Sequence, residues 1–398
     1  MSLSVELGIS KAFTLDDPVA GVLDGTDFVL GGVEFVDVTP KVRTLSLSRG
    51  KNRELDRFNA GTLEVTFNNE DRDFDPLFSG SPYVNNIVPR REVRVLAGTA
   101  LQYVGKVLDW NFSYEPQGRQ SAQLQAADAF TFLSQQVLTP GTATEQFSGA
   151  SVEAVLDMPT VDWPASDRDI DTGASTLGAD VFAGNVLSYL ERVEQSEAGL
   201  LFINKEGQVT FRDRLASPTV GGALVFADDG TGIPFAPAAV EYGTEQLFNQ
   251  VTVQSRFGTA TANNILSQTR YGILERDVNT LLSDESQSQD LANFLVGRDA
   301  EPEYRFAQIA IDIDNLTPAQ EDDVFGLEIG GVIQVKLTPG NPPTGSAIER
   351  YGRVISLAHS VEPDSHMLFI GLGSVQTSLF VLNDGEFGKL DGAGILAF

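Results

Sequence analysis

The sequence contains no cysteine, and only two of its 398 residues are histidine. The absence of cysteine excludes disulfides, thiolate metal ligands and cysteine nucleophiles together, and it fits synthesis in a reducing cytoplasm. The two histidines, His359 and His366, lie seven residues apart on either side of the turn VEPDS. Neither is near a Gly-x-Ser-x-Gly nucleophile elbow. Histidines placed in this way are typical of side chains that satisfy backbone hydrogen bonds.

Long hydrophobic runs and nucleotide-binding loops are also missing. Hydrophobic residues make up 42% of the chain, but no apolar run approaches the roughly 20 residues that a membrane span needs. The N-terminus MSLSVELGIS has no basic region followed by an apolar one, so no secretory signal is predicted. No G-x-G-x-x-G or P-loop motif appears, and no cofactor is expected.

Positive charge is scarce. Lys and Arg number 27 against 55 Asp and Glu, which gives a net charge of −28. Because phosphate contacts need cations, a chain this acidic is not expected to bind nucleic acid tightly. Repulsion would suit a protein that lets DNA slide past without sticking, whereas the simpler interpretation of the charge is solubility.

The first half of the chain shows period-two hydrophobic spacing. Apolar residues alternate in GTLEVTFNN (61–69), EVRVL (92–96), LDWNFSY (108–114) and SAQLQAAD (121–128). This spacing is typical of half-buried strands. We therefore predict an antiparallel β-barrel or sandwich over 41–140, with a short helical piece in 126–137.

Helical spacing appears next. Val152, Val155 and Leu156 follow Ser151, and a second apolar stripe runs through 186–193 before Gly199. Two apolar runs then flank 205–208, which predicts a β-hairpin. Residues 141–215 are thus predicted to be an α+β insert.

The β pattern resumes in the C-terminal half. Strands are expected in NQVTVQS, AQIAIDI, LEIGGVIQVKL, RVISLAHSV and HMLFIGLG, interrupted by one helix in SQSQDLANFLVGR. Residues 216–373 are predicted to be a second β-barrel with one inserted helix. The fold class is therefore mainly β with an α+β insert, containing two small antiparallel barrel or sandwich domains.

The two ends of the chain carry a repeat. FTLDDPVAGVLDG (13–25) and FVLNDGEFGKLDG (380–392) share seven identical positions. Each is a short extended segment closed by an Asp-Gly turn, too short to bury a core alone. We predict docking segments within 1–40 and 374–398 that add strands to neighbouring subunits.

No pattern of catalytic or metal-binding residues stands out, and no site residue is assigned. Asp71, Asp73 and Asp75 have the spacing of the first ligands of an EF-hand, but position six is Pro76 and position twelve is Pro82. A second run, Asp167, Asp169 and Asp171, also lacks the glycine and the distal acid. The chain is not predicted to be an enzyme, although the sequence leaves open a carboxylate pair that hydrolyses cell wall.

Exposed aromatic residues could instead stack on sugars. Trp110, Phe112 and Tyr114 lie on one face of a predicted strand. Such a face is far more often core than a sugar platform, so a host-binding adhesin is the alternative function and a hydrolase ranks below it.

Several stretches resemble minor tail proteins of siphophages that infect actinobacteria. They include RELDRFNAGTLEVTFNNEDRDFDP (53–76), GNVLSYLERVEQSEAGLLFINKEGQVTFRDR (184–214) and LEIGGVIQV (327–335) with RVISLAHSVEPDSHMLFIGLG (353–373). Related barrels often carry Gly-Asp before Val, where this chain has Gly331. The resemblance covers nearly the whole chain and contains no catalytic motif.

The resemblance implies a structural virion protein, a hub of the tail tip or baseplate. Such hubs are homotrimers whose two barrels per chain alternate around the axis and convert sixfold into threefold symmetry. It also implies contacts with the distal tail protein, the tape measure and tip or fibre proteins, and a place in the DNA-exit channel. Phage DNA would pass without specific binding.

Overall fold

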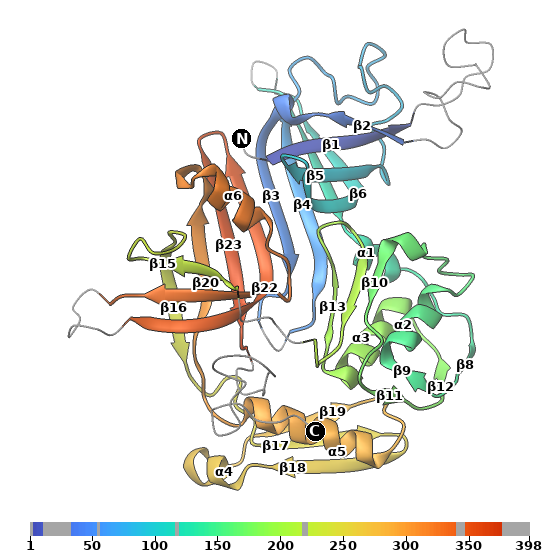
Figure 1. The fold of residues 1–398 in the computed structure, drawn as a ribbon. Coiled ribbons are helices and arrows are strands. Elements are labelled where there is room, and N and C mark those ends of the chain that lie inside the picture. The colour runs from blue at the N-terminus through green and yellow to red at the C-terminus, as the bar shows by residue number, and fades with distance from the viewer. Residues whose placement is uncertain are drawn as a thin grey trace.

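The computed structural model describes residues 3–10, 33–53, 56–115, 119–216, 222–339 and 347–375, and Figure 1 shows the arrangement. One large sheet occupies the upper part of the view, and a second, smaller body of helices and short strands lies below it. The predicted repeats at 13–25 and 380–392 lie outside the described residues.

The large sheet has thirteen strands drawn from both ends of the chain. The N-terminal strands are β1 (Leu3–Ser10), β2 (Val33–Asp37), β3 (Val42–Gly50), β4 (Asn59–Asn68), β5 (Glu92–Ala97), β6 (Ala100–Ser113) and β7 (Ser121–Ala127). The C-terminal strands are β15 (Leu224–Ala227), β16 (Ala236–Tyr242), β20 (Tyr304–Asp312), β21 (Val332–Leu337), β22 (Ile348–Glu362) and β23 (Ser365–Gly373).

Neighbouring strands follow the order β16-β20-β23-β22-β3-β4-β7-β6-β5-β1-β2, and β21 joins β22 to β15. All of these pairs are antiparallel except β15 with β21. The predicted antiparallel β architecture is confirmed, but as one sheet. Within the described ranges the order ends at β16 and β2, and no closed barrel forms.

The two predicted β regions join where β3 pairs with β22. Strand β22 pairs with β21 through its first residues and with β3 from Ser356 to Val361. Gly50 lies at this change of partner with φ of 110°, and a Cβ there would come within 2.2 Å of the Ile355 carbonyl oxygen. Only glycine combines that backbone conformation with so close an approach. The long β22 therefore connects two ladders into one sheet.

A bulge in β6 changes which residues face the core. Tyr103 and Val107 are fully buried, whereas the half-buried face continues through Trp110 and Phe112. The register shifts between Val107 and Asp109, so one extra residue reverses the alternation. The strand predicted over 108–114 is confirmed, but it is the second part of a longer one.

Short sheets and helices form the lower body. Its strands are β8 (Gly141–Ala143), β9 (Gln146–Phe147), β10 (Arg168–Ile170), β11 (Thr176–Leu177), β12 (Asp180–Phe182), β13 (Leu200–Ile203), β14 (Val209–Arg212), β17 (Gln250–Ser255), β18 (Gly258–Asn263) and β19 (Glu275–Asn279). Its helices are α1 (Ala129–Leu133), α2 (Ser148–Leu156), α3 (Val186–Glu197), α4 (Ile265–Tyr271) and α5 (Glu285–Asp299). The predicted hairpin is confirmed, because β13 and β14 pair antiparallel around 204–208.

One further α-helix and three short 3₁₀ turns remain among the described residues. Helix α6 (Pro318–Phe325) begins with a capping box between Thr317 and Gln320. Three short 3₁₀ turns complete the structure: η1 (Thr39–Lys41), η2 (Ala165–Asp167) and η3 (Ile313–Asn315). No helix in the described part of the chain is both long enough and apolar enough to cross a membrane.

Buried side chains divide into two cores. The sheet core contains residues from β1 to β7 together with residues from β15, β16, β20 to β23 and α6. The second core combines α1, α2, α3, β13 and β14 with β17 to β19 and α5. The helix expected as an insertion in the second β region thus buries Leu291 and Leu295 beside the α+β residues. The domain boundaries stay predictions, because burial does not show which segments fold independently.

Part of the range predicted as an N-terminal docking extension belongs to the sheet. Residues 3–10 and 33–37 form β1 and β2, and β1 lies between β2 and β5. Leu3, Val5 and Leu7 are fully buried in the sheet core. Their alternation in SLSVELGIS is the signal for this strand. Likewise Val375, two residues into the predicted C-terminal segment, is buried.

Candidate functional site

The first run of aspartates is held by cations of this chain. Lys41 Nζ lies 2.9 Å from Asp71 and 2.8 Å from Asp73, and both carboxylates raise the lysine pKa. Asp75 accepts two hydrogen bonds from Arg72, at 2.9 and 2.6 Å, and one from the Leu77 amide. These bonds lower the pKa of Asp75. The run is a turn with internal charge pairing.

The second run of aspartates is also paired with a cation of this chain. Asp169 and Asp171 both pair with Arg212 of β14, the latter at 3.1 Å, and the two carboxylates raise the arginine pKa. Asp167 lies in η2 and accepts a hydrogen bond from the neighbouring Ser166 hydroxyl. No cluster of three or more potential metal ligands occurs in the residues that the structure covers.

The structure brings the two histidines together. They lie on the paired strands β22 and β23, with His359 Nδ1 3.0 Å from His366 Nε2. Phe325 of α6 lies about 6 Å from both rings. Burial lowers the pKa of His359 to about 3, with a further contribution from His366, and it lowers the pKa of His366 to about 4. Two neutral imidazoles thus form a buried polar contact in the sheet core.

The aromatic stripe predicted on one strand becomes a stack of rings. Trp110 and Phe112 lie 6.4 Å apart with nearly parallel planes, and Phe112 continues to Tyr114 at 6.3 Å. Phe74 from the preceding loop stacks on Trp110 and on Phe67 of β4. Tyr114 is half exposed, whereas Phe67 and Phe74 are fully buried. The stripe therefore serves mainly as packing for the sheet core.

A polar contact that sequence analysis missed joins the two cores. Arg49 of β3 is 4% exposed, and its guanidinium donates to Glu328 at 2.9 Å and to the Ile203 carbonyl at 3.4 Å. The same Glu328 accepts the Lys205 amide at 2.8 Å. Lys205 also donates from its ammonium group to the carbonyls of Phe325 and Gly326. The hairpin of the second core is thereby held against the sheet.

Two carboxyls with raised pKa values lie near this junction, the fully buried Asp128 and the half-buried Glu194. Asp128 caps α1 and accepts hydrogen bonds from the amides of Gly61 (2.6 Å) and Phe130 (3.0 Å). Burial raises its pKa to about 7 in spite of these bonds. Glu194 of α3 accepts from the Leu201 amide at 3.3 Å, and burial also raises its pKa to about 7. An aspartate directly before AFTFL is an N-cap signal that could have identified the first of these.

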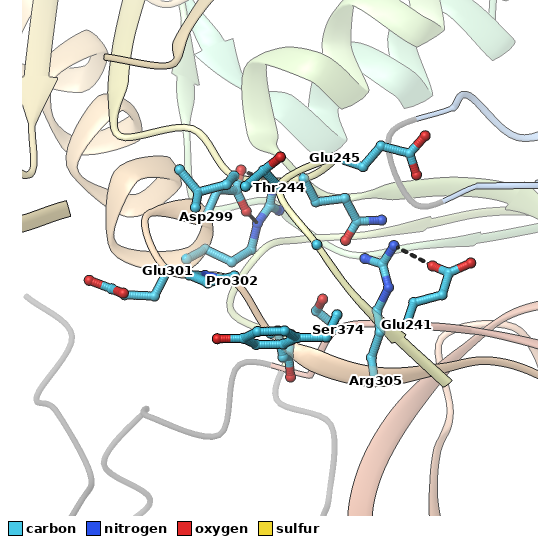
Figure 2. Close-up of a pocket in the computed structure, with 14 residues that line it drawn as sticks. Glu241, Thr244, Glu245, Asp299, Glu301, Pro302, Arg305 and Ser374 are labelled. Carbon is cyan, nitrogen blue, oxygen red and sulfur yellow. Dashed lines mark hydrogen bonds and ion pairs between the residues drawn. The ribbon is translucent and has the colours of Figure 1, made fainter. Parts of the chain in front are cut away.

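A cavity of about 380 Å³ lies between the end of α5 and the edge of the large sheet (Figure 2). Arg305 pairs with Glu241 at 3.0 Å across its lining, as the dashed line in Figure 2 shows. Arg298 pairs with Asp299 at 2.6 Å on the α5 side. Ser374, just after β23, also lines the cavity. Glu245 and Glu301 of the lining pair with Arg53 and Arg270, which lie outside it, so the cavity is a polar junction crossed by ion pairs.

The remaining candidate sites are two groups of exposed apolar residues on the lower body. Four apolar residues of α4 and the turn after it are exposed: Ile265, Leu266, Tyr271 and Ile273. We call these the α4 surface. A second group of exposed apolar residues, Val137, Phe147 and Val181, lies along the short strands β8, β9 and β12 and just before them. Figure 1 places α4 and these strands at opposite sides of the lower body.

Comparison with known proteins identifies the fold. No protein-family model and no curated protein sequence matches the chain. The 43 kDa tail protein of prophage MuSo2 from Shewanella oneidensis has a similar structure, with a TM-score of 0.56, 13% identity and coverage of 94% of this chain and 96% of that one. The tail protein from Neisseria meningitidis MC58 matches with a TM-score of 0.56 and 10% identity, covering 93% and 95%. The chain therefore shares a phage tail protein fold along almost its whole length.

Proposed function

We propose that this chain is a structural virion protein of a phage tail tip, a baseplate hub that links the tail tube to distal tip proteins. The observation that carries this proposal is the likeness of fold to two tail proteins along nearly the full length of both chains. The sequence resemblance to minor tail proteins of actinobacterial siphophages supports it independently. The protein would be made in the host cytoplasm and act in the virion.

We further propose that three copies form a ring around the tail axis. In each copy the strands β1 to β7 would form one barrel-like unit, and the strands β15, β16 and β20 to β23 would form the other, joined at the β3–β22 pair. Six such units would match a sixfold tube above a threefold tip. Closed cyclic symmetry is also common among homo-oligomers. The net charge of −28 would keep passing DNA from adhering to the channel wall.

The partners in this proposal are other copies of the chain, the distal tail protein, the tape measure, and tip or fibre proteins. The repeats at 13–25 and 380–392 would reach adjoining subunits in the assembled tail and pair with sheet edges. The edge strands β2 and β16 are available for such pairing within the described sheet, since each has one neighbour there.

Imaging of intact virions that carry a label on this protein tests the proposal. We expect density at the junction of tail tube and tip, with three copies per virion. Six or twelve copies would contradict the threefold ring. Density at the outermost tip without contact to the tube would favour the adhesin alternative.

A second measurement addresses hydrolysis. Purified protein is incubated with host peptidoglycan and arabinogalactan, and the soluble sugar and peptide are compared with a boiled control. We expect no difference, because the carboxylates of both aspartate runs are engaged by Lys41, Arg72 and Arg212. Release above the control would identify a cell-wall hydrolase.

A further inference from the structure

A second cavity, of about 170 Å³, lies between the large sheet and the lower body. Five cationic side chains line it: Lys51, Arg57, Arg276, Arg298 and Arg353. Three carboxyls accompany them: Asp56, Glu191 and Glu194. The whole chain has 27 Lys and Arg against 55 Asp and Glu, so the charge balance of the chain is reversed at this place. We call it the cationic cavity.

The carboxyls offset only part of this positive charge. Arg57 pairs with Glu191 of α3, and Arg298 of α5 pairs with Asp299 at 2.6 Å. Glu194 contributes less than a full negative charge near neutral pH, because burial raises its pKa to about 7. The lining of the cavity is therefore positive on balance.

The charge of Arg276 on β19 is weakly compensated. Its Nη1 atom lies 3.5 Å from Asp299, which already accepts shorter bonds from Arg298 at 2.6 and 2.9 Å. The same Nη1 makes no hydrogen bond to the described residues. Burial lowers the pKa of Arg276 and Arg298 lowers it further, while Asp299 acts in the opposite direction. A guanidinium in this position is costly unless an anion offsets its charge.

The cations come from both parts of the molecule. Arg353 lies on β22 of the sheet, and Lys51 and Arg57 lie between β3 and β4. Arg276 and Arg298 lie on β19 and α5 of the lower body. Like charges that line one cavity repel each other, and the repulsion is stronger where water is partly excluded. An anion held between the two parts would turn this repulsion into attraction.

The size of the cavity suits a small ion. One water takes about 30 Å³ in the liquid, so a cavity of about 170 Å³ has room for an ion of several heavy atoms. Guanidinium groups bind oxyanions through paired N–H donors. We propose that the cationic cavity binds an inorganic oxyanion of the sulfate or phosphate class, which accepts hydrogen bonds from arginines of both the sheet and the lower body.

Calorimetric titration of the full chain with sodium sulfate at pH 8 tests the proposal. Sodium chloride at the same ionic strength is the control for general salt effects. We expect saturable binding of one sulfate per chain and no such binding of chloride. The absence of saturable sulfate binding would overturn the proposal.

A variant of Arg276 locates the ion. Arg276→Gln removes the charge but keeps a polar side chain, and it should weaken sulfate binding by about tenfold or more, because a hydrogen bond from a charged group is lost. The control Arg256→Gln removes the same charge from an exposed position between β17 and β18, and it should leave binding unchanged. Circular dichroism checks the fold of both variants. Equal weakening in both would show a response to net charge alone and would overturn the site.

A variant of Glu194 should have the opposite effect. At pH 8 Glu194→Gln removes a negative charge from the lining, so sulfate binding should become severalfold tighter. A failure to fold cannot produce this result. Glu285→Gln, exposed at the other end of α5 from Arg298, is the matched control and should not change the affinity. Unchanged or weaker binding in Glu194→Gln would contradict an ion in this cavity.

Competition separates a free ion from a phosphate group of nucleic acid. Inorganic phosphate should displace sulfate, whereas a short single-stranded oligonucleotide should not, because the net charge of −28 repels a polyanion. Displacement by the oligonucleotide would overturn the assignment to an inorganic ion. The inference does not depend on the tail assignment, since the ion would bind to the isolated chain wherever the protein acts.

Discussion

The two cores differ in the ionisable groups that they enclose or border. The sheet core encloses His359 and His366, whose pKa values burial lowers to about 3 and about 4. The second core has Glu194 on α3, whose pKa burial raises to about 7. Both groups are neutral in the folded protein near pH 6, but they respond to pH in opposite directions. The stability of each core therefore depends on pH in its own way. The contact between the cores is the ion pair of Arg49 with Glu328.

A substitution at the junction between the two cores should have the largest effect on the free energy of unfolding. Arg49→Ala removes a buried guanidinium and leaves Glu328 without its partner, so we expect a loss of about 4 kcal/mol in the free energy of unfolding. Arg43→Ala on the same strand breaks an exposed pair with Glu70 and should cost less than about 1 kcal/mol. Denaturant titration of both variants measures the difference. Similar losses would mean that Arg49 does not couple the cores.

The histidine pair should dominate the acid response of the sheet core. Unfolded imidazoles titrate near pH 6.5, whereas the folded ones stay neutral down to about pH 4. The unfolded chain thus binds more protons between these values, and stability falls as the pH is lowered through this window. The variant His359→Gln with His366→Gln should lose about 3 kcal/mol less than the wild type between pH 6.5 and 4. Parallel curves would show that the rings are not buried as neutral partners.

Glu194 should act with the opposite sign. Its folded pKa of about 7 lies above the ordinary 4.5, so its contribution is present below about pH 4.5 and is lost as the pH rises to 7. Glu194→Gln should therefore stabilise the protein by about 2 kcal/mol at pH 8, a value reduced because the side chain is partly accessible. Glu191→Gln, on the same helix and paired with Arg57, should give no gain. Thermal melts at pH 4.5 and 8 measure both.

The smallest effect is expected at the first aspartate run. Lys41→Ala removes two surface ion pairs and should cost at most about 1 kcal/mol, less in 1 M salt. Calcium should not raise the melting temperature of the wild type, because Lys41 and Arg72 occupy the carboxylates. A calcium-dependent rise would show that the run binds the ion.

The local elements follow from short-range pattern. Alternating Leu63, Val65 and Phe67 predict β4, and the stripe through Leu190 and Val193 predicts α3. The failure at β6 has a specific cause, because the bulge near residue 108 reverses the alternation and no residue type marks it. The prediction of an extension over residues 1–40 is wrong for β1, whose own period-two spacing of Leu3, Val5 and Leu7 places it in the sheet.

The candidate sites could likewise be predicted from the sequence only in part. The spacing of both aspartate runs identified turns rich in carboxylates, but the cations that engage Asp73 and Asp171 come from Lys41 and Arg212, which are remote in sequence. The exposed face of α4 could not be predicted, because the sequence pattern of a short apolar helix is the same whether its apolar face is buried or exposed. The bond from the Ser267 hydroxyl to the carbonyl of Ala300, the residue that ends α5, joins segments that are remote in sequence.

Composition and hydrophobic period act locally, and they are sufficient to predict a mainly β chain with an α+β segment, strongly acidic and without thiols. Tertiary structure decided that β3 pairs with β22, that His359 meets His366, and that Arg49 meets Glu328. These contacts join residues that carry no information about one another in their local patterns. They form because closing a long loop costs little more than closing a short one, while the burial that follows stabilises the whole sheet.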